Sequence, residues 1–425
     1  MTKKDFSLML ENIGDKYIVE AYAYVESHKR KFIPKRWIAL AACIILIAAA
    51  FPIGIMLQNS VWFVPVGTGP ITTAPTVVTD PPPSHVHEWG KWSLIRMATA
   101  SEEGLEERVC ECGEKETNAF PLGSEGLEYK LKENETNEII ITGIGTCTDI
   151  ELVIGTYIDG YRVTELAEEV FKDRYDITSV EIPYSITSIS KGAFSGCRRI
   201  KKVILPDGLI QISEKAFKDC SSLISIKLPD GLRILGDRAF ACCYELSNVT
   251  IPKSIEEIGL RAFYECFSLK SINLPSSIKK MGNGIFMRCT TLNSVTIENG
   301  ITEIPTQMFY HCTSLNNVII PESVKVINNE AFEGCTVLES ITLHDGITSI
   351  GSYAFKSCPS LHSIYIPRYL KEIKLQTFHS CQSLKDITFN GTKAEWVAIP
   401  KSREWEPSFK GYTIHCIDGD MKNSE

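Results

Sequence analysis

The sequence predicts a solenoid, mostly β, whose coils stack into a curved parallel sheet along one side. Three observations predict this fold class: a phenylalanine recurs every 23 residues, apolar residues recur at fixed distances from it, and a proline follows most of the apolar stretches. The phenylalanines are at positions 171, 194, 217, 240, 263, 286, 309, 332, 355 and 378. Ten units in one register are the signature of stacked repeats, each of which buries its apolar faces only against its neighbours.

Each unit is expected to contribute one short strand to this sheet. The residues nine and eleven positions after each phenylalanine are apolar in every unit, as Ile226 and Leu228 are. An apolar residue at every second position is typical of one face of a β-strand. Proline follows directly in seven of the ten units, and because it lacks a backbone N–H it ends the strand and turns the chain. The next segment, for example 254–263, is expected to return by an irregular or single-turn helical path that stacks successive phenylalanines.

A column of nine cysteines runs through the same units. Cysteine stands three positions after phenylalanine from Cys197 to Cys381, and Arg174 takes this place in the first unit. Fifteen cysteines in a chain expected outside a cell suggest disulfides. However, equivalent side chains of stacked coils point in parallel at about 4.8 Å spacing, whereas a disulfide needs Cβ atoms about 3.5–4.5 Å apart and aimed at one another. The nine cysteines are therefore predicted to be reduced and buried.

The segment 37–57 predicts a single transmembrane helix. It contains 21 residues without a charge, and as a helix it would rise about 30 Å, enough to cross a bilayer. Five Lys or Arg lie between positions 29 and 36, and none follows the segment until Lys91. The positive-inside rule then predicts a single-pass protein of the cell membrane with its N-terminus in the cytoplasm and its repeats outside. A signal peptide cleaved near 48–50 and a buried helix of a soluble protein are the alternatives.

Two polar segments flank this helix. Residues 1–36 are expected to form a cytoplasmic tail, either a membrane-surface helix that only sets orientation or a docking segment for a cytoplasmic partner. The sequence from the tail into the helix resembles the tails and anchors of some clostridial membrane proteins, including anti-sigma-factor-like ones. Residues 58–84 are rich in Pro and Thr and cannot bury a core, so they are expected to form a semi-rigid, extended stalk.

Residues 85–118 predict a small module with candidate metal ligands. One half contains His85 and His87, and the other contains Cys110 and Cys112. Imidazole and thiolate are preferred by zinc, and four such ligands complete a tetrahedral structural site. The stretch resembles a small module found near surface repeats of Gram-positive bacteria, which carries a further Cys where this chain has Ala100. A structural zinc ion, a disulfide and a metal-free β module held by its tryptophans remain alternatives; no other cofactor is expected.

The repeat pattern, LxSIxLPxGLxxIGxxAFxxC, resembles the BspA-like or treponemal-type leucine-rich repeat. The resemblance covers 126–419 and implies a leucine-rich repeat solenoid of α/β type, with an N-terminal cap at 126–170, repeats at 171–390 and a C-terminal cap at 391–419. Glu298, His344 and Asn390 replace the turn proline, and Gly155 replaces a proline expected in the N-terminal cap. These departures concern the turns and leave the fold unchanged.

Strand residues that point away from the core are expected to line the concave face. Most are small and polar, as on any solvated sheet. A few larger, charged or apolar residues interrupt this series and are the candidate contacts of a partner: Glu181, Lys202, Ile204, Lys227, Asn273, Ile319 and Tyr365.

The composition and motifs narrow the possible functions. A net charge of -8 argues against nucleic-acid binding, which normally requires a basic surface. No nucleophile elbow, phosphate-binding glycine loop or paired zinc-protease histidines are present, so no enzymatic activity is expected. The resemblance implies surface binding or adhesion to an extracellular protein or glycan. A transmembrane sensor or anti-sigma-like regulator that signals through residues 1–36, and an accessory module or envelope scaffold, are the alternatives.

Overall fold

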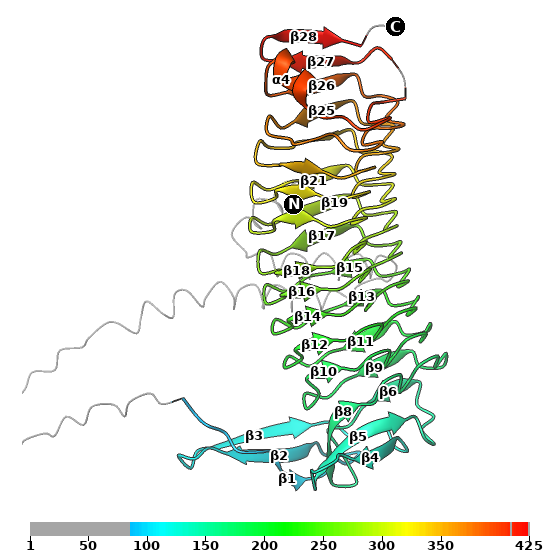
Figure 1. The fold of residues 1–425 in the computed structure, drawn as a ribbon. Coiled ribbons are helices and arrows are strands. Elements are labelled where there is room, and N and C mark those ends of the chain that lie inside the picture. Colours follow the sequence, from blue (N-terminus) through cyan, green and yellow to red (C-terminus); the bar gives the residue numbers. More distant parts are fainter. Residues whose placement is uncertain (1–85, 409, 424–425) are drawn as a thin grey trace, which may run out of the picture. The chain divides into compact units, whose positions relative to one another are not determined.

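The computed structural model describes residues 86–408 and 410–423. The predicted cytoplasmic tail, transmembrane helix and stalk, and His85, lie outside the described residues. Within the described part, no helix is long and apolar enough to cross a membrane. The described residues belong to one compact unit, a mostly-β solenoid of about 12 turns. Figure 1 shows its coils stacked in chain order from the N-terminal cap to the C-terminal end.

The predicted parallel strands form the long-strand ladder. Partners in neighbouring strands are 23 positions apart, as in Ser271 with Ser294 and Ser363 with Asp386, so the register of the ladder equals the sequence repeat. Cap strands extend it, because β6 (Glu151–Val153) pairs with β9 and β27 (Thr413–Cys416) pairs with β26. Its repeat strands are β9 (Ser179–Glu181), β11 (Lys202–Ile204), β13 (Ser225–Ile226), β15 (Asn248–Val249), β17 (Ser271–Leu274), β19 (Ser294–Ile297), β21 (Asn317–Ile319), β23 (Ser340–Ile341), β25 (Ser363–Ile366) and β26 (Asp386–Phe389).

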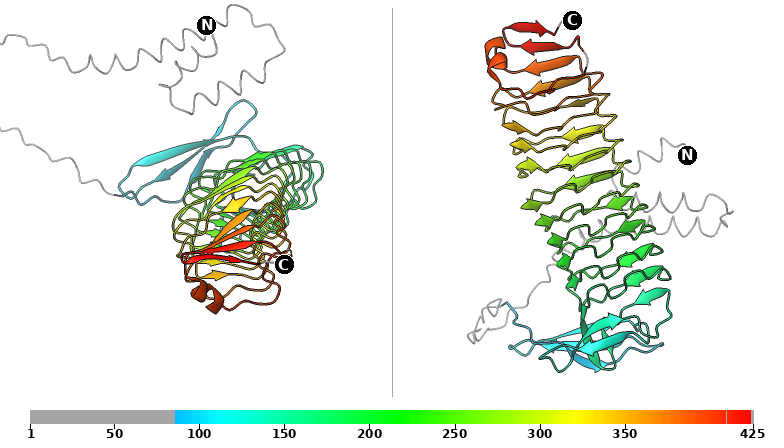
Figure 2. Two further views of the ribbon diagram at one scale, coloured as in Figure 1. Left: turned by 90° about the horizontal axis from the view of Figure 1, so that it is seen from above. Right: turned by 45° about the vertical axis from the view of Figure 1, so that its right-hand side comes forward.

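The return path is irregular for most of its length, as one of the two expectations had it, but it also contains extended residues that were not expected. Eight return segments contain a second strand of two residues, the segment before Phe378 has only a single bridge residue, Ile373, and the described repeats at 171–390 contain no helix. The inward residue of each short strand is apolar and buried in most coils, as Ile212 and Ile258 are, so a second side of the coil also needs extended backbone. Figure 2 shows both ladders along the column. The short strands are β10 (Ser188–Ile189), β12 (Gln211–Ile212), β14 (Ile234–Leu235), β16 (Glu257–Ile258), β18 (Lys280–Met281), β20 (Glu303–Ile304), β22 (Val326–Ile327) and β24 (Ser349–Ile350).

The phenylalanine column stacks as predicted. All ten rings are fully buried, and successive ring centroids lie 5.3–5.9 Å apart from Phe171 to Phe378. The backbone beside the rings also joins the coils, since the amide of Phe217 donates to the carbonyl of Ala239 at 2.9 Å. Neighbouring coils are therefore bonded at every phenylalanine turn and, within several separate stretches of parallel sheet, also at the long or the short strands.

The nine column cysteines are free and buried, as predicted. Each thiol also donates a hydrogen bond to the carbonyl of the phenylalanine 26 residues earlier, at 3.0–3.3 Å from sulfur to oxygen. Burial raises the pKa of Cys266 well above its usual value, so its thiol stays protonated and able to donate. Cysteine thus supplies both a small apolar side chain and a weak hydrogen-bond donor at this site. Alanine would supply the small apolar side chain but no donor.

The N-terminal end consists of a hairpin module, residues 86–120, and the cap. The module is an antiparallel sheet in the order β1-β2-β3, and the cap has a four-stranded sheet in the order β4-β5-β8-β7. The strands are β1 (Ser93–Arg96), β2 (Gly104–Val109), β3 (Lys115–Phe120), β4 (Glu128–Leu131), β5 (Glu138–Gly143), β7 (Tyr157–Ile158) and β8 (Tyr161–Leu166).

The C-terminal cap closes the other end of the column. Thr392 caps the N-terminus of helix α4 (Lys393–Ala398). Its side chain and that of Glu395 form a reciprocal capping box. The chain then continues the coil pattern, since the amide of Phe378 donates to the carbonyl of Trp405 at 2.9 Å. The last strand, β28 (Gly419–Lys422), pairs antiparallel with β27 and extends past the predicted boundary at 419. The reversal of strand direction ends the parallel ladder.

Candidate functional site

The outward side of the long-strand ladder, here called the strand face, carries the predicted binding residues. Side chains alternate in β17, where Ser271 and Asn273 are exposed and Ile272 and Leu274 are buried. The same alternation recurs in β11, β19, β21 and β26. The strand residues that were predicted to point away from the core therefore face solvent.

Four of the seven predicted residues gather near the N-terminal end of the strand face. Ile204 pairs directly with Glu181 of the preceding strand. Lys227 holds the same repeat position one coil further on, and Lys202 lies two residues before Ile204 on the same face. The two lysines are exposed, and Ile204 leaves 40% of its surface to solvent. We call these four residues the Ile204 patch.

The other three predicted residues are dispersed along the ladder. Ile319 is 67% exposed and lies five coils from Ile204, or roughly 24 Å at ordinary strand spacing. The side-chain amide of Asn273 donates to Glu298 at 3.1 Å. The hydroxyl of Tyr365 donates to Asp345 at 2.7 Å, and burial together with this bond raises the pKa of Tyr365 to about 12. Asn273 and Tyr365 are thus already engaged within the solenoid.

These bonds lie at the turns where the repeat lacks its proline. Glu298 accepts a second hydrogen bond from the amide of Ser276 at 3.0 Å, and Asn390 donates to the Asp345 carboxylate at 2.6 Å. A ring nitrogen of His344 lies 2.9 Å from the carbonyl oxygen of Pro321. Side-chain bonds therefore stabilise the turns that proline shapes elsewhere. This structural role accounts for Asn273 without invoking a binding partner. The Ile204 patch and Ile319 remain as the outward groups best suited to contact a partner protein.

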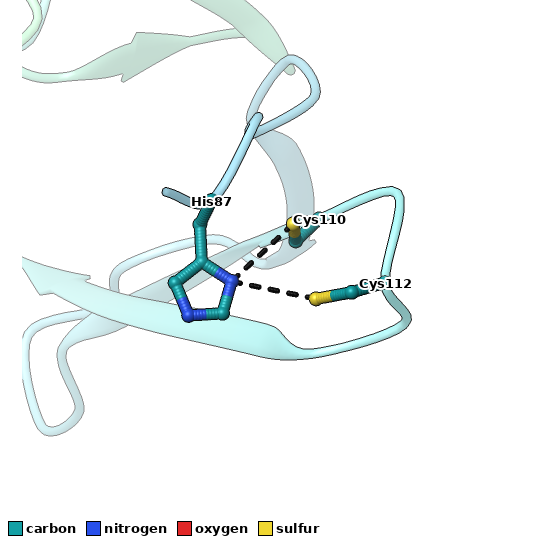
Figure 3. Close-up of side chains that lie close together, drawn as sticks. All are labelled: His87, Cys110 and Cys112. Atoms are coloured by element: carbon teal, nitrogen blue, oxygen red, sulfur yellow. Dashed lines mark hydrogen bonds between the residues drawn. The ribbon is translucent and has the colours of Figure 1, made fainter. Parts of the chain in front are cut away.

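The second candidate site lies at the tip of the β2–β3 hairpin. Nδ1 of His87 is 3.4 Å from Sγ of Cys110 and 3.3 Å from Sγ of Cys112. Figure 3 shows the imidazole facing both sulfur atoms. The potential ligand atoms of these three residues all lie within 4.8 Å of one another. The structure thus brings together three of the four predicted metal ligands; the fourth, His85, lies outside the described residues.

Backbone geometry shapes this cluster. The turn after β2 is closed by the amide of Gly113, which donates to the carbonyl of Cys110 at 2.8 Å, and Gly113 adopts a φ of 87° that favours glycine. Burial raises the pKa of Cys110, but hydrogen bonds from Cys112, His87 and the backbone of Glu88 outweigh it and lower that pKa to about 7. The hairpin tip therefore favours a thiolate at Cys110.

A buried carboxylate docks the hairpin module onto the cap and the first repeat. Glu106 of β2 is fully buried and accepts hydrogen bonds from the hydroxyl of Tyr157, at 2.6 Å, and from that of Tyr184. The guanidinium of Arg162 lies 3.3 Å from the same carboxylate. Burial and the hydrogen bond to Glu106 raise the pKa of both tyrosines. The sequence analysis did not identify this network, because Glu106 occurs once and its partners lie 51 to 78 residues away.

A polar cleft of about 520 Å³ lies beside this network, where the module meets the cap. Lys91, Trp92 and Arg162 are among its lining residues. The ammonium of Lys91 pairs across it with Glu135 at 2.9 Å, and this bond lowers the pKa of Glu135. Because Lys91 belongs to the module and Glu135 to the cap, the pair adds an exposed ionic link to the buried one at Glu106.

The family follows from the repeat. A family model described as BspA type leucine-rich repeat region matches residues 164–293 and 282–396, in six copies, which together cover more than half of the chain. The chain belongs to the BspA-type leucine-rich repeat family. Members of this family are built from non-catalytic repeats. The registered phenylalanines, cysteines and prolines thus lie within the family repeat, whereas the hairpin cluster lies outside the residues of this BspA-type chain that the family model matches.

Several solved structures resemble this BspA-type chain. A leucine-rich cell surface protein from Faecalibacterium prausnitzii is 23% identical, with 66% of this chain and 98% of that chain covered and a TM-score of 0.37. A leucine-rich repeat protein of T. pallidum is 26% identical, with coverages of 56% and 90% and a TM-score of 0.37. The pneumococcal vaccine antigen PcpA is 20% identical, with coverages of 69% and 93% and a TM-score of 0.41. No curated protein matches the chain.

Proposed function

We propose that this chain is a membrane-anchored, non-enzymatic binding protein of the bacterial cell surface, whose repeats bind an extracellular partner protein. The observation that carries the proposal is the Ile204 patch: an exposed apolar side chain flanked by two lysines and a glutamate on a strand face whose outward residues are mostly small and polar. The repeats place these residues on a rigid, parallel ladder, so the surface is formed before the partner arrives.

The chemistry of the patch favours a protein with an apolar residue bordered by carboxylates. Ile204 offers apolar area, and the stems of Lys202 and Lys227 can add to it while their ammonium groups stay solvated. Positive charge on a chain whose net charge is -8 gives a local contrast that orients an acidic partner. Glycan recognition usually stacks sugars on exposed aromatic rings, and the Ile204 patch contains none. The proposed function is therefore binding of a protein partner, and adhesion through it.

The proposed anchor is the apolar segment 37–57, with residues 1–36 in the cytoplasm and the stalk at 58–84 carrying the repeats outside. The support is the run of 21 uncharged residues and the cluster of basic residues on its N-terminal side alone. In intact cells that express the full chain, an added protease should remove the repeats and leave a membrane-bound N-terminal fragment. Resistance of the repeats in intact cells, with cleavage only after lysis, would contradict this orientation.

The Ile204 patch can be tested by capture with the full chain on beads. Extracellular and surface proteins of cells from the same habitat are offered to the wild-type chain and to the double variant Ile204→Asp, Lys227→Glu. Reversing the charge and removing the apolar group should lower the amount of captured protein by about tenfold or more, the effect expected of an interface hot spot.

The control introduces the same number of carboxylates elsewhere on the strand face. Thr296→Asp with Ser340→Glu alters exposed outward positions several coils away and should capture the same proteins as wild type. Equal capture by the Ile204 patch variant and wild type would overturn the proposed binding site. Binding to immobilised glycans that survives both double variants would replace the protein partner with a glycan bound elsewhere.

A further inference from the structure

We propose that His87, Cys110 and Cys112 bind a Zn²⁺ ion that ties the tip of the β2–β3 hairpin to the strand-like segment entering the module. This site is separate from the strand face, so it goes beyond the proposed partner binding and does not depend on it. The three residues come from two segments more than twenty positions apart that the antiparallel bridge between Trp89 and Cys110 brings together.

The distances in the cluster match those that a shared zinc ion imposes. Zinc bonds of about 2.0 Å to nitrogen and 2.3 Å to sulfur, at a tetrahedral angle, place nitrogen and sulfur roughly 3.5 Å apart. The two observed separations between Nδ1 of His87 and the sulfur atoms are 3.4 and 3.3 Å. One nitrogen facing two sulfur atoms at nearly equal distances fits three ligands that share one ion, and Figure 3 shows this nitrogen directed at both sulfur atoms.

The opposite side of the imidazole ring has the partner expected behind a metal-bound histidine. Nε2 of His87 lies 3.2 Å from the carboxylate of Glu114, which stands two residues beyond Cys112 on the same hairpin. Histidines that bind metals commonly donate their second ring N–H to a carboxylate, which fixes the tautomer and the orientation of the ring. With Nε2 protonated and bonded to Glu114, Nδ1 carries the lone pair that faces the two sulfur atoms.

The hairpin also prepares the sulfur atoms as ligands. Zinc holds its nitrogen and sulfur ligands at short, fixed distances, so a site must bring them together around one point. Both sulfur atoms lie close to Nδ1 of His87, at 3.4 and 3.3 Å. The turn between the two cysteines is closed by the bond from the amide of Gly113 to the carbonyl of Cys110 at 2.8 Å, which keeps Cys110 and Cys112 on the same side of the hairpin tip as the imidazole.

The ligand types select the metal. Two thiolates and one imidazole are soft to borderline donors that favour Zn²⁺ over Mg²⁺ or Ca²⁺, which prefer oxygen. The alternative of a Cys110–Cys112 disulfide would form a ring across a single intervening residue and turn the sulfur atoms toward each other. In the structure both face His87 instead. A bound metal ion therefore explains the positions of all three side chains, whereas a disulfide would explain those of the two cysteines alone.

The test uses the full chain and Zn²⁺ itself. Purified chain is equilibrated with Zn²⁺, passed through a desalting column and analysed for bound metal by mass spectrometry. About one zinc ion per chain is expected in the wild type and a loss of nearly all of it in Cys112→Ser and in His87→Ala. Glu114→Gln should keep the ion but weaken binding by about 10- to 100-fold, as expected for a carboxylate that only positions a ligand.

Two measurements separate loss of the site from loss of the fold. Cys242→Ser and Cys416→Ser change half-buried cysteines outside the cluster and should keep the ion. With Co²⁺ in place of Zn²⁺, the wild type should show thiolate-to-cobalt absorption that Cys112→Ser lacks, while the β-sheet circular dichroism of both stays the same. Absence of stoichiometric zinc in the wild type, retention of zinc by Cys112→Ser, or a Cys110–Cys112 disulfide in the native chain would each overturn the proposal.

Discussion

Two kinds of contact hold the described residues together: the contact between neighbouring coils and the contact between the hairpin module and the cap. The first is mainly apolar and the second is mainly polar. Coils meet through stacked phenylalanines, buried aliphatic columns and thiol-to-carbonyl hydrogen bonds, and this contact repeats at every step. The module meets the cap and the first repeat through one fully buried carboxylate, two tyrosine hydroxyls and an arginine. The coil contact is redundant and apolar, whereas the module contact is single and polar.

This difference has consequences for stability. In a solenoid the free energy is a sum of nearest-neighbour terms, so damage to one coil weakens the two interfaces it shares and leaves distant ones intact. A buried carboxylate stabilises a contact only while all its partners are in place, because an unpaired charge or hydroxyl in a dry site is costly. The coil contact should therefore fail in proportion to lost volume, and the module contact should fail when one charge is removed.

The largest effect is expected from Phe263→Ala. Its ring is fully buried and stacks on Phe240 and Phe286 at 5.6 Å on each side, so truncation leaves a cavity between two coils. The free energy of unfolding should fall by about 3–5 kcal/mol. This loss of stability can be measured by alkylating the nine column thiols during denaturant unfolding, because these thiols become reactive only when the coils open.

Tyr175→Ala is the control for loss of an aromatic ring, since Tyr175 is 52% exposed, and it should change the unfolding free energy by less than about 0.5 kcal/mol. If Phe263→Ala unfolded at the same denaturant concentration as the parent chain, the stacked column would not be the main source of cohesion between coils. Native thiols that react rapidly, or that are already paired, would contradict the reduced and buried column.

A smaller and more local effect is expected from Glu106→Gln. The amide keeps the shape but removes the charge that Arg162 and the two tyrosines share, which should weaken the module contact by about 2 kcal/mol. Hydrogen exchange should accelerate in β2 and β3 and stay unchanged in the central coils. Glu107→Gln, on the next residue of the same strand and paired with the exposed Lys115, should leave exchange unaltered. Equal acceleration in both variants would show that the buried charge has no special role.

The sequence was sufficient for features that repeat. The positions of Phe263 and Cys266 in their columns, and the outward and inward faces of the long strands, follow from a period that ten units confirm. The second ladder was missed because its strands are only two residues long, too short for an alternating pattern to be recognised. The hydrogen bonds that the thiols donate were missed. The position of a cysteine in the repeat predicts that it is buried, but it does not predict which backbone carbonyl lies beside its sulfur atom.

Features that occur once were predicted only where residue chemistry is distinctive. His87, Cys110 and Cys112 were expected to meet because imidazole and thiol are uncommon and suited to metals. Glu106 resembles any strand carboxylate in the sequence, and only the fold brings it to its partners. On the strand face, outward position was predictable, but whether a residue such as Asn273 is bonded within the solenoid depends on which turns lack proline.

The smallest effect is expected at the C-terminal cap, where a single polar contact is exposed instead of buried. His415 of β27 lies between Asp386 of β26, at 3.0 Å from Nε2, and Asp420 of β28, at 2.9 Å from Nδ1. These two carboxylates raise the pKa of His415 above its usual value. A raised pKa in the folded state means that the stabilising energy is fully present below the pKa of the unfolded chain, near 6.5, and is lost as pH rises through the folded value.

His415→Gln should therefore destabilise the cap at pH 5.5 to 6 by no more than about 0.5 kcal/mol, since solvent and salt screen a contact at which the histidine side chain is 39% exposed. The difference from wild type should shrink as the pH is raised to 9 and as salt is added, and hydrogen exchange in β27 and β28 measures both trends. His362→Gln removes an exposed histidine elsewhere and should show neither trend. A His415→Gln effect that grew with pH would mean that the neutral imidazole, as a hydrogen-bonding spacer between the two strands, matters more than its charge. In that case the C-terminal cap, like the module contact, would depend on the geometry of its hydrogen bonds. Unlike the module contact, it would not depend on a buried charge.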